Sequence, residues 1–97
     1  MKVYIAGKVS GFEPSVFHYK FDKCKETIQK HLPEGTEIIV PTDLCDDDWG
    51  WEKCMDVCVG TLITCNLVVV MDDWNSSKGA QEEIRIATEN NIPIWFL

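Results

Sequence analysis

The chain has 97 residues, of which 45% are hydrophobic and 26% charged, and its formal net charge is −7. A chain of this length forms one domain around a single modest core, and we assign residues 1–97 to it. The composition excludes intrinsic disorder, and an acidic chain without a basic stripe is not expected to bind DNA or RNA polymers. No apolar run is long enough for a bilayer and no leader opens the chain, so we expect a cytoplasmic protein without a membrane partner.

The first half of the chain predicts two strands separated by a helix. Residues 2–6 are a short apolar run that predicts the first strand. Pro14 is suited to the first turn of a helix, which ends at residues 33–35. Apolar side chains recur in this helix at near-helical spacing, at Phe17, Phe21, Cys24, Ile28 and Leu32. Residues 36–40 form a β-branched run typical of a second strand.

The second half continues the alternation of strands and helices. We expect a polar loop over 42–51, a helix over 52–64, a strand over 67–71, a loop over 72–77, a helix over 78–91 and a strand over 93–97. This order predicts an α/β fold, a three-layer Rossmann-like (flavodoxin-like) parallel sheet of about four strands with helices on both faces. The expected strand order, 2-1-3-4, has a switch point between the first and third strands, and ligands bind there, outside the carboxyl ends of the strands.

A small-residue loop follows the first predicted strand and contains Gly7, Ser10 and Gly11. It lacks the spacing of a phosphate-binding P-loop and that of a dinucleotide fingerprint. Two interpretations stay open for it. The loop is either a tight strand-to-helix turn or a place where a ligand approaches the backbone closely.

A second candidate stretch, residues 75–80, leads into the last predicted helix. Ser76 or Ser77 could be the N-cap of that helix. The free N–H groups and the dipole of a helix start also favour an anion, and a 5′-phosphate would suit the site. We therefore take Ser76, Ser77, Lys78 and Gly79 as candidate substrate-binding residues.

Glu83 is the most informative residue of this helix. At about 100° per residue it falls between Ile86 and Ala87 on the buried arc, whereas Glu82 falls on the polar face. The structural interpretation is a first-turn acid stabilised by the helix dipole. The functional interpretation is a nucleophile for glycosyl transfer, which would attack an anomeric carbon of oxocarbenium character.

Other residues at the expected strand ends could assist this chemistry. Asp72 and Asp73 are candidate catalytic partners, and Tyr4 on the first strand could donate a hydrogen bond that orients the nucleophile. Three tryptophans could stack on a base or simply pack a loop onto the sheet: Trp49, Trp51 and Trp74.

The five cysteines are expected to be free, buried thiols rather than a disulfide framework, because we expect a reducing compartment. Cys54 and Cys58 are four residues apart and would share a helix face, but His18 and His31 show no ligand spacing to them. A thiol or metal module built on this pair is a remote alternative, and we assign neither a metal nor a cofactor.

Several of these segments together resemble the nucleoside 2-deoxyribosyltransferase-like superfamily, and they are closest to its small bacterial and phage members. The resemblance runs from Lys2 to the last strand. The matching segments are Val-Tyr-Ile-Ala-Gly at 3–7, Val-Pro at 40–41, Cys-Asn-Leu-Val-Val-Val at 65–70 and the stretch 73–87. Its most specific part is Gly79-Ala80-x-x-Glu83-x-x-x-Ala87, which is similar to the family's helix start.

The resemblance implies a role for three residues. It makes Glu83 the nucleophile that forms a deoxyribosyl intermediate, Tyr4 the residue that positions it, and Ser77 a ligand of the 5′-phosphate. We therefore expect cleavage of an N-glycosidic bond or 2-deoxyribosyl transfer on a nucleoside or nucleotide, in a homo-oligomer. The family's second catalytic aspartate has no counterpart in register, so non-catalytic binding of a nucleotide derivative is the alternative.

Overall fold

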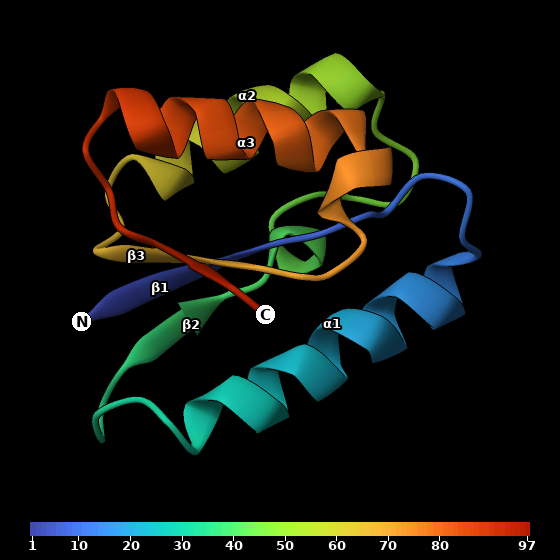
Figure 1. Cartoon of the computed structure of the whole chain (residues 1–97). Helices are drawn as coiled ribbons and strands as arrows, with labels where there is room; N and C mark the ends of the chain where they lie inside the picture. Colours follow the sequence, from blue (N-terminus) through green and yellow to red (C-terminus); the bar gives the residue numbers. More distant parts are fainter.

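Four parallel strands form the centre of the computed structural model, which describes all 97 residues (Figure 1). The strands are β1 (Lys2–Ala6), β2 (Glu37–Ile39), β3 (Leu67–Val70) and β4 (Ile94–Phe96). Their order is β2-β1-β3-β4, and all three neighbouring pairs are parallel. The predicted α/β fold and the order 2-1-3-4 are confirmed.

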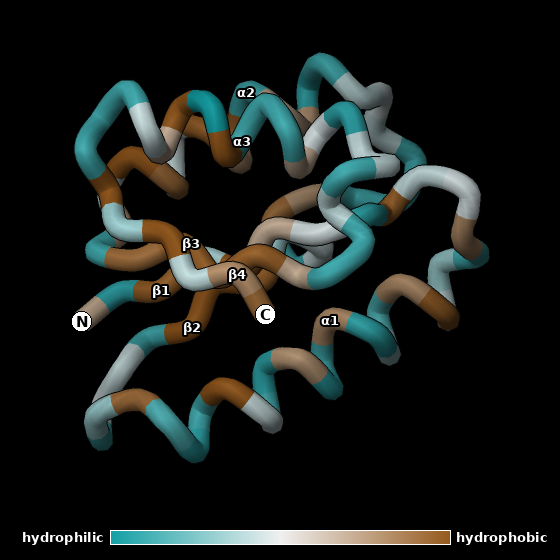
Figure 2. Tube along the Cα trace, in the orientation of Figure 1, coloured by the Kyte–Doolittle hydropathy of each residue, from teal (hydrophilic) through white to brown (hydrophobic).

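Three helices cover the two faces of this sheet. Helix α1 (Pro14–Gln29) lies on one face, and α2 (Trp51–Leu62) and α3 (Lys78–Glu89) lie together on the other (Figure 1). The strands carry the most hydrophobic part of the trace, between these layers (Figure 2). No helix is both long enough and apolar enough to span a membrane.

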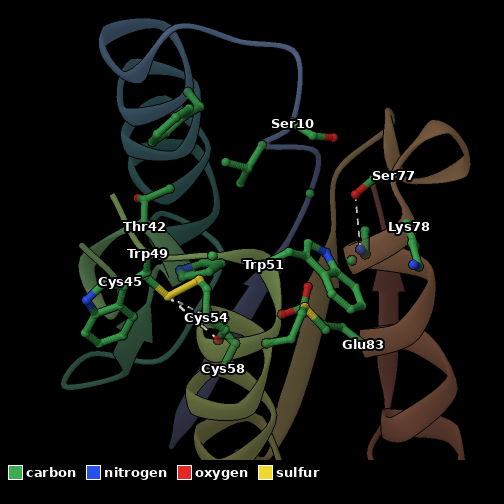
Figure 3. A pocket seen from close by; sticks show the side chains of 18 of the residues that line it. Ser10, Thr42, Cys45, Trp49, Trp51, Cys54, Cys58, Ser77, Lys78 and Glu83 are labelled. Atoms are coloured by element: carbon green, nitrogen blue, oxygen red, sulfur yellow. Dashed lines mark hydrogen bonds between the residues drawn. A yellow bond between two sulfur atoms is a disulfide. The ribbon is translucent and has the colours of Figure 1, made fainter. Parts of the chain in front are cut away.

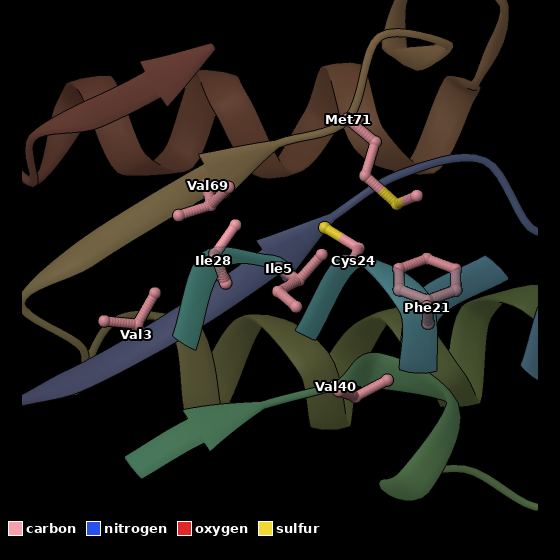
Figure 4. Close-up of a cluster of buried hydrophobic side chains, with 8 residues drawn as sticks. All are labelled: Val3, Ile5, Phe21, Cys24, Ile28, Val40, Val69 and Met71. Carbon is pink, nitrogen blue, oxygen red and sulfur yellow. The ribbon is translucent and has the colours of Figure 1, made fainter. Parts of the chain in front are cut away.

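Alternation along β1 decides which side chain meets which helix layer. Val3 and Ile5 enter the cluster beneath α1, where they pack with Phe21 and Ile28 (Figure 4). Tyr4 belongs to the opposite cluster, beneath α2 and α3. Because successive strand residues point to opposite faces, Tyr4 shares its face of the sheet with the helix that carries Glu83.

All predicted helices and strands are present, but the helices end earlier than predicted. Helix α1 ends at Gln29, ahead of the predicted stop at 33–35, because the chain tightens into a turn in which His31 N–H donates to the Ile28 carbonyl at 2.9 Å. Helix α3 ends at Glu89, and Asn91 then adopts a positive φ of 56°. A 3-10 turn at Pro41–Asp43 overlaps the start of the predicted loop 42–51, and another, at Trp74–Ser76, lies within the predicted loop 72–77.

Candidate functional site

A cavity of about 560 Å³ lies on the α2 and α3 side of the sheet, at the carboxyl end of β1. Its walls come from the loop after β1, the segment between β2 and α2, the first turns of α2 and the start of α3, and Phe17 of α1 completes them. Figure 3 shows Thr42 and the cysteines on one side of this space, with Ser77, Lys78 and Glu83 on the other. The site therefore draws on segments far apart in the sequence.

Glu83 lies in the wall of this cavity with only 4% of its surface exposed. The Tyr4 hydroxyl donates a hydrogen bond to Glu83 Oε2. The helical wheel predicted that Glu83 points inward, and Tyr4 was a candidate partner on the first strand. The structure brings the two side chains together.

Burial sets the charge state of Glu83. Desolvation raises the pKa of its carboxyl group from 4.5 to about 7, although the Tyr4 hydrogen bond lowers it. Burial also raises the pKa of Tyr4 well above its usual value, and the neighbouring Glu83 charge adds to this effect. Glu83 therefore carries a proton that it can lose near neutral pH, which is the property of a tuned acid or base.

Ser77 is the N-cap of α3, which settles the choice between Ser76 and Ser77. The Ala80 N–H donates to Ser77 Oγ at 3.1 Å. Ser77 and Gly79 line the cavity together with Lys78, whose Nζ lies 4.6 Å from the centre of the Trp51 ring. The start of α3, with its one lysine, thus forms part of the cavity wall.

We expect Ser77→Ala to lower the free energy of unfolding by about 1 kcal/mol, because it removes the side-chain acceptor of the cap. Urea denaturation of the variant measures this loss. Ser76→Ala is the matched control, since Ser76 is exposed and its Oγ donates to the Asp73 carbonyl outside the cavity. Equal destabilisation by the two variants would contradict the cap assignment.

The loop after β1 contributes two of its three predicted residues to the cavity wall. Gly7 and Ser10 line the cavity, whereas Gly11 does not. Gly11 has a φ of +87°, as a turn requires. A Cβ at Gly7 would lie 2.6 Å from Met71 Sδ, so packing against the end of β3 also favours a glycine there.

Five other predicted residues lie outside the cavity lining: Tyr4, which lies behind Glu83, and Asp72, Asp73, Trp74 and Ser76. Asp73 is held elsewhere, since its Oδ2 lies 2.5 Å from Lys20 Nζ and its Oδ1 accepts from the Lys8 N–H at 3.1 Å. Trp74 packs against Phe96 with ring centres 5.6 Å apart. The structure therefore groups Glu83 and Tyr4 but leaves both predicted partner aspartates away from them.

Sequence reasoning missed three polar groups of the cavity wall: Thr42, Asp46 and Asp47. The Thr42 hydroxyl is buried without a hydrogen-bond partner, which leaves it free for a ligand. Asp47 Oδ1 lies 3.2 Å from His18 Nε2 of α1. The position of this segment after the second strand pointed to the carboxyl ends of the strands, but the sequence left open whether the acidic run at 46–48 closes over a ligand or stays solvated.

Two of the five cysteines are joined, which makes the expectation of free thiols wrong for them. Cys45 and Cys54 form a disulfide between the 44–50 loop and α2. The other three are free and buried, as expected: Cys24, Cys58 and Cys65. Cys45 comes from a loop whose path the sequence pattern does not determine, so its approach to α2 could not be predicted.

The parallel four-stranded sheet, its two helical layers and a cavity at the strand ends define a Rossmann-like α/β domain. The chain belongs to the family described as "Domain of unknown function (DUF4406)", which matches residues 1–96. No curated protein matches the chain. The family description states no activity, so the function has to be argued from the site.

Proposed function

We propose that the protein cleaves or transfers the N-glycosidic bond of a nucleoside or nucleoside 5′-monophosphate, with Glu83 as the nucleophile. The observation that carries this proposal is the buried Glu83 carboxyl group, hydrogen-bonded by Tyr4 in the wall of the cavity. The resemblance to the nucleoside 2-deoxyribosyltransferase-like superfamily assigns these residues the same two roles.

The proposed reaction forms and breaks one bond in each step. The Glu83 carboxylate attacks the anomeric carbon, and the base leaves with the electron pair of the C–N bond and takes up a proton. The resulting glycosyl ester is then attacked by water, which gives hydrolysis, or by a second base, which gives transfer. Asp46 and Asp47 line the cavity and are candidates for the proton donor, in place of Asp72 and Asp73.

The cavity wall offers complementary groups for the rest of such a substrate. Trp49 and Trp51 present aromatic surface on which a base can stack. The unpartnered Thr42 hydroxyl can bond to a sugar or base, and the start of α3 with Lys78 can hold a phosphate. The cavity wall contains three acidic side chains, Asp46, Asp47 and Glu83, but only one lysine, Lys78. Because this balance of charge repels a phosphate, a neutral nucleoside competes well with its monophosphate.

Binding without turnover is the second candidate, and the burial of Glu83 favours it. With a pKa of about 7, the carboxyl group is protonated in a large fraction of molecules at neutral pH. A protonated carboxyl group is a hydrogen-bond donor and a poor nucleophile, which suits a sensing or sequestering protein.

Incubation with a panel of deoxynucleosides and their 5′-monophosphates separates the two candidates. We expect free base to appear in the chromatogram of at least one substrate and to accumulate faster as the pH rises through about 7. Calorimetry on the same compounds measures binding. Tight binding with the ligand recovered intact would support the second candidate, and absence of both binding and release would refute both.

A further inference from the structure

Three cysteine sulfurs meet beside the cavity and make a second candidate site. Cys58 Sγ lies 3.7 Å from Cys45 Sγ and 3.9 Å from Cys54 Sγ. All three residues line the cavity, and Figure 3 shows the three side chains converging. We propose that reduction of the Cys45–Cys54 disulfide converts this cluster into a three-thiolate site for Zn²⁺ or a similar thiophilic divalent cation.

The arrangement of the sulfurs fits a tetrahedral ion. Zn–S bonds of about 2.3 Å in a tetrahedral site place the sulfurs about 3.8 Å apart. The two distances from Cys58 already have this value. Cys54 and Cys58 are one helical turn apart on α2, and Cys45 approaches them from the loop, so the reduced Cys45 and Cys54 sulfurs need only separate from each other.

The fourth position of the ion would face the cavity. All three cysteines line the cavity, so a water molecule from the cavity is available as the fourth ligand. Three thiolates leave the Zn²⁺ complex with a charge of −1, and the cation neutralises most of the charge that burial would otherwise disfavour. The sequence pattern indicated a metal module on Cys54 and Cys58 only as a remote alternative, because these two cysteines alone supply two ligands and the approach of Cys45 was not predicted.

Disulfide exchange within the cluster is the competing use of three adjacent sulfurs. It would need the Cys58 sulfur to attack Cys45 or Cys54, and it would leave one of the three cysteines as a thiol. Exchange takes place only while a disulfide is present, whereas the metal site forms only after reduction, so the redox state of the protein separates the two uses.

The test begins with reduction of the disulfide by a phosphine. The phosphine is oxidised to its oxide with the oxygen of a water molecule, and the disulfide accepts two electrons and two protons and becomes two thiols. The reduced chain, stripped of metal with a chelator and kept without oxygen, is titrated with Zn²⁺ and separately with Co²⁺. We expect one metal ion per chain by elemental analysis and the Co²⁺ absorption bands of tetrahedral thiolate coordination. The unreduced protein should bind neither ion at this stoichiometry.

Variants of single cysteines locate the ion. Cys58→Ser should weaken Zn²⁺ binding by roughly 100-fold or more, since even changes outside the ligand shell cost 10–100-fold. Cys65→Ser is the matched control, because Cys65 is a buried thiol outside the cavity lining whose Sγ donates to the Thr61 carbonyl. Cys45→Ser, in the loop, repeats the test without altering a helix.

Three results would overturn the metal site. They are substoichiometric zinc in the reduced protein, equal binding by the unreduced protein, and unchanged affinity in both Cys58→Ser and Cys45→Ser. Metal content is independent of nucleoside turnover, so this proposal and the glycosidic one can fail separately.

Discussion

Glu83→Gln is expected to abolish base release while making the folded protein more stable above pH 7. The amide cannot attack an anomeric carbon, so turnover should fall by a factor on the order of 10³ or more. The shape of the side chain is kept, and the Tyr4 hydroxyl can still donate to its oxygen. The loss of activity would thus be chemical rather than structural.

The gain in stability follows from the raised pKa of Glu83. The folded protein holds the Glu83 proton up to a pKa of about 7, whereas the unfolded chain releases it near 4.5. The contribution of Glu83 to the free energy of unfolding is therefore fully present below pH 4.5 and is lost as the pH rises through 7. The total loss approaches about 3 kcal/mol. Glutamine removes this cost but buries an amide, so we expect a net gain of about 1–3 kcal/mol at pH 8.

Urea denaturation of both proteins at pH 5 and pH 8 measures this effect. The variant's advantage should be present at pH 8 and shrink toward pH 5, where the wild-type carboxyl group is protonated. Glu82→Gln is the matched control on the same helix, because Glu82 pairs with Arg85 at the surface and should leave turnover unchanged. Full base release by Glu83→Gln would remove Glu83 from the role of nucleophile.

The elements that form the site follow from local patterns in the sequence. The helical spacing of Ala80, Ile84 and Ala87 predicted that Glu83 points inward. Tyr4 was a candidate partner because it lies on the first strand, and the family resemblance paired it with the nucleophile. The face of β1 that Tyr4 occupies was not predicted; in the structure, alternation along the strand places Tyr4 beneath α3, where it meets Glu83 from 79 positions away.

Pairings made by loops and by remote side chains could not be predicted in this way. Asp73 follows β3 as expected, but Lys20 of α1 holds its carboxylate at 2.5 Å, and no local pattern predicts that ion pair. The 44–50 loop brings Asp46 and Cys45 to the cavity for the same kind of reason. The path of a loop depends on the packing of several elements, so its residues at the site become visible only in three dimensions.

Tyr4→Phe should move the pH dependence of turnover rather than abolish it. The Tyr4 hydroxyl donates to Glu83 Oε2 and lowers the pKa of that carboxyl group against the larger effect of burial. A hydrogen bond to a charged group contributes about 1.5–3 kcal/mol, which corresponds to roughly one to two pH units. Without it the pKa of Glu83 rises above 7, and base release at pH 7 should fall by roughly 5–50-fold, in proportion to the carboxylate fraction.

The shape of the pH profile distinguishes this electrostatic role from a structural one. If Tyr4 acts through Glu83, raising the pH should restore much of the rate of Tyr4→Phe, because the carboxylate forms again. A variant whose packing is damaged would lose the same fraction of activity at every pH. Tyr19→Phe is the control, since Tyr19 is 64% exposed on α1. A profile that keeps its midpoint in Tyr4→Phe would show that Tyr4 only fills space beneath α3, and the polarity of the cavity alone would then set the charge of Glu83.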